Sequence, residues 1–256
     1  MRALLLAPVL VPAFALVLAP VLAAPAGAVE PPLVALDVGH FTLAPGATSA
    51  RGRSELEFNR DLAALVREAL ARRGLRVRLI GYDGEMSVLS RRAAAARGAD
   101  LLLSIHHDSV QPHFLQDWTY EGENLRFSDR YAGFSLFVSR RNPALPASLA
   151  CASAVGAAMN GAGFVPSLYH ADPIPGESKS FADRANGVHY YDNLVVLHAA
   201  AQAAVLVEAG VIVNRDEELA LRDPARQSRM AEAIADGVRS CLGARGRTLT
   251  RRGSLG

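Results

Sequence analysis

Three short apolar runs, each followed by ionisable residues, constrain the fold of this 256-residue chain more than any other feature. The runs and the residues into which they lead are 33–36 with Asp37, 101–105 with His106, and 204–207 with Glu208. Because the runs are nearly all apolar and do not alternate with polar residues, they are typical of strands buried on both faces of a sheet. The sequence therefore predicts a covered sheet with ionisable side chains at its strand ends.

The segments between these runs predict further strands and several helices. Strands are expected at 75–80 and 134–138, and helices at 54–73, 87–97, 146–162 and in a C-terminal pair broken near Pro224. Strands that alternate with helices indicate an α/β fold. No internal repeat and no strong linker divides the chain. We therefore expect a single domain over residues 29–242, with a mostly parallel or mixed central sheet of about six strands and helices on both faces.

The two ends of the chain differ from this central region. Residues 3–28 carry no charge, are largely apolar and end in Ala26-Gly27-Ala28. This pattern predicts a secretory signal peptide over residues 1–28, although a transmembrane anchor is the alternative. Such a leader would direct the protein to the periplasm or the medium and would then be cleaved. We expect no membrane attachment after cleavage, because no second long apolar run follows. Residues 243–256 are rich in Arg and Gly, and we expect a disordered tail there.

Charge and cysteine content narrow the class of protein further. The chain has 27 basic and 25 acidic residues, which argues against a nucleic-acid-binding protein because such proteins need a basic face. The two cysteines are Cys151 and Cys241. Export would allow a disulfide between them, but two separate buried thiols fit the sequence as well.

The strand ends carry residues that suit a metal site. His40, His106 and Glu208 follow three of the predicted strands, and ligands of open α/β sheets gather at such ends. Two histidines and a glutamate with an open position are a known hydrolytic zinc arrangement. The glutamate ligand is Glu55 or Glu57. We favour Glu55, because Ser54 and Glu57 fit a helix capping box that gives Glu57 a structural role.

A set of short motifs, in order along the chain, points to one family. The motifs are Asp37-Val38-Gly39-His40, Gly52 with Glu55 and Asn59, Gly74-Leu75-Arg76-Val77, Leu89-Ser90-Arg91-Arg92, Ala99-Asp100 followed by Ser104-Ile105-His106, and Val205–Glu208 with Gly210 and Asn214. In these motifs the chain resembles the zinc-dependent N-acetylmuramoyl-L-alanine amidases of the amidase-3 type. The resemblance extends from about Val34 to Leu221, which is nearly all of the predicted domain.

The resemblance implies an activity and roles for four residues. His40, Glu55 and His106 would hold one Zn²⁺ per chain, and Glu208 would be the catalytic acid and base. The substrate would be peptidoglycan, cut at the amide between the lactyl group of N-acetylmuramic acid and L-alanine. The alternatives are a zinc carboxypeptidase or another amide hydrolase acting within wall peptides, and a non-catalytic wall-binding or regulatory module. We expect a monomer, and the sequence leaves open whether an activator protein is required.

Other residues are candidates for supporting or substrate-binding roles. Asp108 stands where the family commonly has asparagine, and we expect it to orient a ligand histidine. Asp37, Asn59 and His107 are further candidates of this kind. His189 is either a substrate contact or an ordinary loop histidine. The segment 110–132 is longer than the resemblance leads us to expect, and forms either a lip over the cleft or a surface loop.

Overall fold

The computed structural model describes the backbone of residues 30–253 and the side chains of residues 30–243. The predicted signal peptide, residues 1–28, lies outside the described residues. No helix within 30–253 has the length and apolar character needed to cross a membrane.

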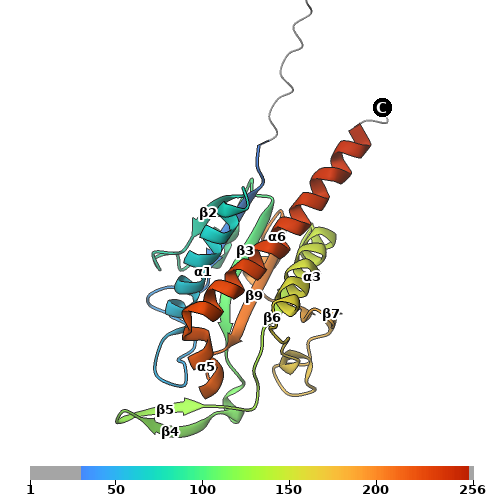
Figure 1. The fold of residues 1–256 in the computed structure, drawn as a ribbon. Helices are drawn as coiled ribbons and strands as arrows, with labels where there is room; N and C mark the ends of the chain where they lie inside the picture. Colours follow the sequence, from blue (N-terminus) through green and yellow to red (C-terminus); the bar gives the residue numbers. More distant parts are fainter. Residues whose placement is uncertain (1–29, 254–256) are drawn as a thin grey trace, which may run out of the picture. The chain divides into compact units, whose positions relative to one another are not determined.

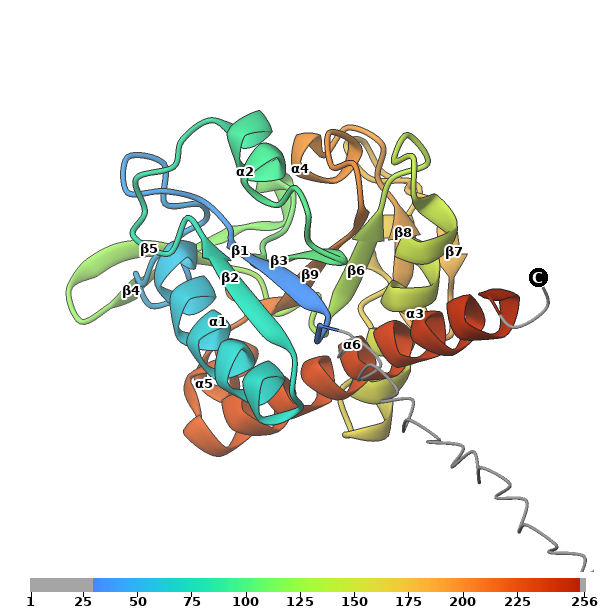
Figure 2. The ribbon, with the colours of Figure 1, turned by 90° about the horizontal axis from the view of Figure 1, so that it is seen from above.

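A seven-stranded mixed sheet forms the centre of the fold, as predicted, with one strand more than the expected six (Figure 2). In spatial order its strands are β2 (Arg76–Ile80), β1 (Leu33–Val38), β3 (Leu101–Asp108), β9 (Ala203–Val211), β6 (Ser135–Val138), β8 (Val188–Tyr190) and β7 (Phe181–Asp183). The first four strands are parallel, β6 runs antiparallel to β9, and β7 runs antiparallel to β8. The carboxyl ends of β1, β3 and β9 therefore lie at one edge.

Helices cover both faces of this sheet (Figure 2). One face carries α1 (Glu55–Arg72), α3 (Leu145–Gly161) and α6 (Pro224–Gly253), and the other carries α2 (Leu89–Ala95) and α4 (Val195–His198). Side chains in β1 alternate between the faces, because Val34 and Leu36 join the first core cluster while Ala35 joins the second. Burial on both faces explains why the strands read as continuous apolar runs.

The segment 110–132 folds into a structure of its own. It contains a short 3₁₀ helix, Pro112–Phe114, and a two-stranded hairpin formed by β4 (Gln116–Tyr120) and β5 (Glu123–Phe127). The two turn residues, Glu121 and Gly122, both have positive φ, which is the geometry of a tight hairpin turn. The hairpin lies beyond the carboxyl end of β3, beside α5 (Arg215–Arg222) (Figure 1).

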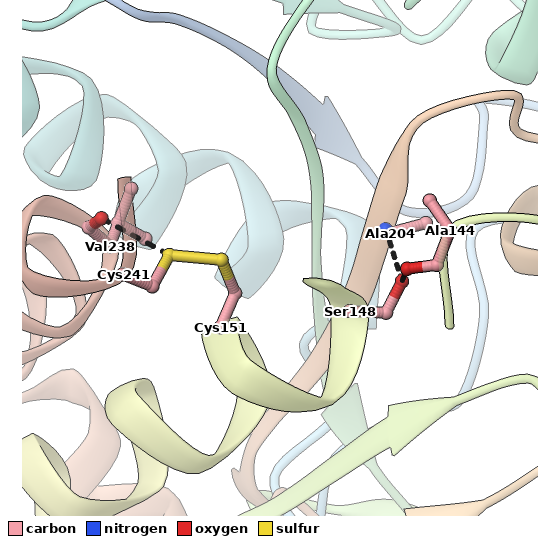
Figure 3. The surroundings of a disulfide bond; sticks show 6 residues. All are labelled: Ala144, Ser148, Cys151, Ala204, Val238 and Cys241. Carbon is pink, nitrogen blue, oxygen red and sulfur yellow. Dashed lines mark hydrogen bonds between the residues drawn. A yellow bond between two sulfur atoms is a disulfide. The ribbon is translucent and has the colours of Figure 1, made fainter. Parts of the chain in front are cut away.

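A disulfide between Cys151 and Cys241 links α3 to α6, with 5.1 Å between the two Cα atoms (Figure 3). Next to it, the Ser148 hydroxyl of α3 accepts a hydrogen bond of 3.0 Å from the backbone N–H of Ala204 in β9. The disulfide joins the two helices to each other, and the hydrogen bond joins α3 to the sheet. The structure thus favours the disulfide over the alternative of two separate thiols.

The predicted disordered tail, residues 243–256, overlaps the end of α6, and its last residues, 254–256, lie outside the described residues. The backbone of α6 remains helical to Gly253. Ala, Arg and Leu, which favour helices, occur among the glycines of this stretch and let the helix continue. A second 3₁₀ helix, Tyr169–Ala171, and the three-residue strands β7 and β8 lie in a region for which we predicted no elements.

Candidate metal centre

His40, Glu55 and His106 come together at the edge where β1 and β3 end. One potential ligand atom from each residue lies within 4.8 Å of those of the other two. The two oxygens of Glu55 are shared between the histidines: Oε2 lies 2.9 Å from His40 Nε2, and Oε1 lies 3.0 Å from His106 Nδ1. Burial alone would raise the pKa of Glu55, but hydrogen bonds and charges from His106 and His40 lower it far below its ordinary value. Glu55 is therefore a carboxylate.

The helix start separates Glu55 from Glu57 as the capping argument predicts. Glu57 Oε2 accepts hydrogen bonds from the Ser54 hydroxyl, at 2.7 Å, and from the Ser54 backbone N–H, at 3.2 Å. The bond from the Ser54 backbone N–H is the one by which the glutamate of a capping box reaches back to the N-cap residue. Glu55, two residues earlier in the first turn of α1, is left free to face the two histidines.

A chain of hydrogen bonds behind Glu55 fixes its orientation. Asn59, one helical turn further along α1, donates from Nδ2 to Glu55 Oε1 at 3.2 Å and to the Gly39 carbonyl at 3.3 Å. His107 Nδ1 lies 2.8 Å from Asn59 Oδ1, and burial lowers the pKa of His107 to about 3. A neutral His107 donates from Nδ1 to this amide oxygen. Asn59 and His107 thus hold the glutamate in place.

Two glycines make room for the three side chains. A Cβ atom on Gly39 would lie 2.3 Å from the His106 ring, and one on Gly46 would lie 2.3 Å from Glu55 Oε2. Both distances are far shorter than real contacts. The Asp-x-Gly-His motif therefore needs its glycine so that the His106 imidazole can pack against the backbone.

The side-chain contacts of Asp37 are with Arg92 and Ser104. Its Oδ1 pairs with Arg92 Nη1 at 2.8 Å, and its Oδ2 accepts a 2.7 Å bond from the Ser104 hydroxyl. Arg92 is almost fully buried and also donates to the backbone carbonyls of Val38 and His40. Because His40 has a positive φ of 69°, this arginine supports a strained backbone position.

Glu208 lies next to the cluster on the neighbouring strand. It pairs with His106 across β3 and β9, so both side chains project from the same face of the sheet. Its buried Oε2 has no hydrogen-bond partner among the described residues. Burial, together with the charges of Asp108 and Glu55, raises the pKa of Glu208 well above its ordinary value. A buried carboxyl group whose pKa is raised toward the working pH is suited to acid–base chemistry.

Asp108 does not orient a ligand histidine, contrary to our expectation. Its Oδ2 lies 2.7 Å from Nε2 of His170, whose Nδ1 lies 2.8 Å from Glu177 Oε2. Lys179 pairs with the same oxygen of Glu177 at 2.5 Å. Burial alone would lower the pKa of His170, but the charges and hydrogen bonds of Asp108 and Glu177 raise it to about 9. Two cations and two carboxylates therefore form a neutral buried group.

This group predicts that stability falls between pH 7 and pH 9. His170 has a higher pKa in the folded chain than the value of about 6.5 expected when unfolded, so its stabilisation is complete below pH 6.5 and is lost as the pH rises through about 9. We expect the free energy of unfolding of metal-free protein to drop by about 2 kcal/mol between pH 7 and pH 9.

Urea denaturation at several pH values measures this effect. His170→Gln should remove most of the pH dependence, and His198→Gln in α4 should retain it. If the free energy of unfolding fell equally steeply with pH in the His170 variant and in the unchanged chain, the ion-pair assignment would be contradicted.

Several residues near the site were missed or misplaced by the sequence reasoning. His189 is fully buried against the rings of Phe137 and Phe181, so it has no surface on which to contact a substrate. Ser135, which pairs with Glu208 across β6 and β9, carries a buried hydroxyl without a partner among the described residues. Nothing in the sequence pairs His170 with Asp108, because 62 residues separate them.

Comparison with known proteins gives the family. A family model described as N-acetylmuramoyl-L-alanine amidase, of the amidase-3 type, matches residues 34–240. No curated protein sequence matches the chain.

Solved amidase structures share the fold. The amidase Ami1 from Mycobacterium smegmatis is 22% identical with a TM-score of 0.66, covering 83% of this chain and 97% of its own. The catalytic domain of CwlV from Bacillus (Paenibacillus) polymyxa var. colistinus is 27% identical with a TM-score of 0.62, covering 83% and 98%. CwlD from Clostridioides difficile, solved in complex with the GerS lipoprotein, is 18% identical with a TM-score of 0.61, covering 83% and 99%. The chain belongs to the N-acetylmuramoyl-L-alanine amidase family of peptidoglycan hydrolases, which is generally zinc-dependent.

Proposed function

We propose that the chain is an exported zinc amidase that cuts the bond between the lactyl group of N-acetylmuramic acid and the L-alanine of the stem peptide. One observation carries the proposal for the site: His40, Glu55 and His106 converge beside Glu208, whose Oε2 is free of other hydrogen bonds among the described residues. Family membership supplies the bond and the substrate class.

The three clustered residues fit one zinc ion per chain. Imidazole nitrogens and a carboxylate oxygen are ligands that zinc prefers, and three protein ligands leave a position open for chemistry. Asn59 and His107 pre-orient Glu55, so little reorganisation is needed on binding. When bound, zinc supplies polarisation of the amide carbonyl and activation of water.

Glu208 is the residue to which we assign proton transfer. Oε2 would take the proton of the attacking water and deliver it to the nitrogen of L-alanine as that amine leaves. The direction of the pKa shift agrees with this role, because catalytic carboxyl groups commonly have a raised pKa. Asp108, whose charge contributes to the raised pKa of Glu208, is itself paired with His170.

Export to the periplasm or the medium completes the proposal. The leader at residues 1–28 supports it at the level of sequence, and the Cys151–Cys241 disulfide suits an oxidising compartment. We propose that the exported chain acts as a monomer. CwlD, by contrast, was solved with a lipoprotein partner, and so the assay below is run first with the purified chain alone.

The test is digestion of purified peptidoglycan, followed by mass spectrometry of the products. The proposal predicts intact stem peptides with a free L-alanine amine and glycan strands with a free lactyl carboxylate. Products cut inside the stem peptide would indicate a carboxypeptidase or another amide hydrolase. Zinc-loaded protein that releases no product would indicate a binding module.

A further inference from the structure

A cavity of about 520 Å³ lies between three segments of the chain. Its walls come mainly from the loop before α1, the segment after β3 and the hairpin strand β5; the lining residues are 46–49, Ser109, Val110, Pro112, Leu115, Asn124, Leu125, Arg126 and Val213. This volume falls within the usual range for small-ligand sites. The hairpin is the part of the chain that the family resemblance did not lead us to expect, and it supplies one of the three walls.

The cavity adjoins the candidate metal centre. Ala47 lines it, and the backbone N–H of Ala47 donates to Glu55 Oε2 at 3.2 Å. Gly46, which also lines it, packs directly against Glu55 and His40. Ser109 lies on its other wall, three residues after His106. A substrate whose scissile amide lies at the three clustered side chains therefore has a path into this cavity.

The walls are held together before any ligand binds. The Trp118 indole of β4 donates to the Ala50 carbonyl, at 2.8 Å, and so joins the hairpin to the loop before α1. Arg51 of that loop lies over the rings of Trp118 and Tyr120 and pairs with Glu218 of α5 at 2.7 Å. A preformed site loses less conformational entropy when it binds.

Arg126 is the one ionisable residue among those that line the cavity. Two arginines that lie over aromatic rings of the hairpin form ion pairs, Arg51 with Glu218 and Arg215 with Asp129. Arg126 differs, because within the described residues it makes no ion pair, not even with Asp117 directly opposite in the hairpin. The remaining lining groups are apolar, hydroxyl, amide or backbone groups. The lining of the cavity therefore carries one charged side chain, a cation without an ion pair among the described residues.

We propose that this cavity binds the stem peptide and that Arg126 binds the free side carboxylate of the second or the third residue of that peptide. This inference rests on the proposed function, because it places the scissile amide at the metal centre. The glycan side of that amide is neutral, since the lactyl carboxylate is consumed in the bond. The peptide side carries free carboxylates on residues after L-alanine. Guanidinium groups bind carboxylates through paired hydrogen bonds, so charge selects the peptide over the sugar.

The test compares matched synthetic muramoyl-peptides that differ in one group. One substrate has free carboxylates, a second has the side carboxylate of the second residue converted to an amide, and a third has that of the third residue converted. We expect Arg126→Gln to lower kcat/KM about 10-fold on the first substrate, chiefly through KM, as for loss of a partly exposed charged hydrogen bond. The substrate in which the carboxylate bound by Arg126 is converted to an amide should be cut equally well by the unchanged chain and by Arg126→Gln. That result identifies the peptide residue that carries this carboxylate.

Two control variants accompany this comparison. Arg222→Gln removes an exposed arginine at the end of α5, outside the cavity, and should behave as the unchanged chain does. Arg126→Lys should keep part of the preference for the carboxylate. An equal loss on all three substrates, or no loss on any, would overturn the inference and leave the proposed function standing. Failure of the unchanged, zinc-loaded chain to cut any muramoyl-peptide would overturn both.

Discussion

Glu208→Gln should lower turnover of peptidoglycan by roughly 1,000-fold, the middle of the range for loss of a general acid–base group. Glutamine preserves the size of the side chain and cannot exchange a proton. The side chain lies across from His106 with its Oε2 unpartnered among the described residues, so the substitution breaks no observed hydrogen bond at that atom. The variant should therefore fold normally and bind zinc as the unchanged chain does.

Zinc content and melting temperature serve as the controls for this variant. Glu68→Gln, on the exposed side of α1, is a matched substitution that should leave turnover unchanged. Normal turnover by Glu208→Gln would remove this residue from the mechanism. Loss of zinc together with loss of turnover would instead show that Glu208 helps to hold the metal.

Glu55→Gln should lower zinc affinity by at least about 100-fold. Substitutions of residues that merely orient metal ligands cost about 10- to 100-fold, and Glu55 supplies the carboxylate itself. The neighbouring Glu57→Gln is the matched control, because Glu57 caps α1 and lies away from the histidines. It should retain zinc and activity, with at most about 1 kcal/mol lost from stability.

Competition with a chromogenic chelator measures both zinc affinities. If Glu57→Gln lost zinc while Glu55→Gln retained it, the assignment of the ligand would be wrong. Activity measured at saturating zinc gives a second comparison, since the Glu57 variant should then match the unchanged chain.

The central fold could be predicted from the sequence because strands that are buried on both faces consist almost entirely of apolar residues. Strands β1, β3 and β9 are covered on both faces and appear as apolar runs, whereas β7 and β8 have three residues each and are too short to show a period. The ionisable residues at the strand ends follow from the parallel arrangement of β1, β3 and β9. Glu55 could be separated from Glu57 because helix capping is a local interaction.

The parts that could not be predicted depend on contacts between distant segments. The ion-pair group joins Asp108 of β3 to His170 and Glu177, and no local pattern links them. The hairpin β4–β5 has a tight turn at Glu121 and Gly122, but its packing depends on Trp118 reaching Ala50, 68 residues away. The cavity beside the metal centre follows from that packing, and so it became visible only in three dimensions.

Digestion of peptidoglycan in isotopically labelled water tests the central claim most directly. Hydrolysis adds the oxygen of water to the acyl side of the broken bond. We predict that the heavy oxygen appears in the lactyl carboxylate of N-acetylmuramic acid and that L-alanine leaves with an unlabelled free amine. Label in a carboxylate within the stem peptide, with the lactyl amide intact, would contradict the account.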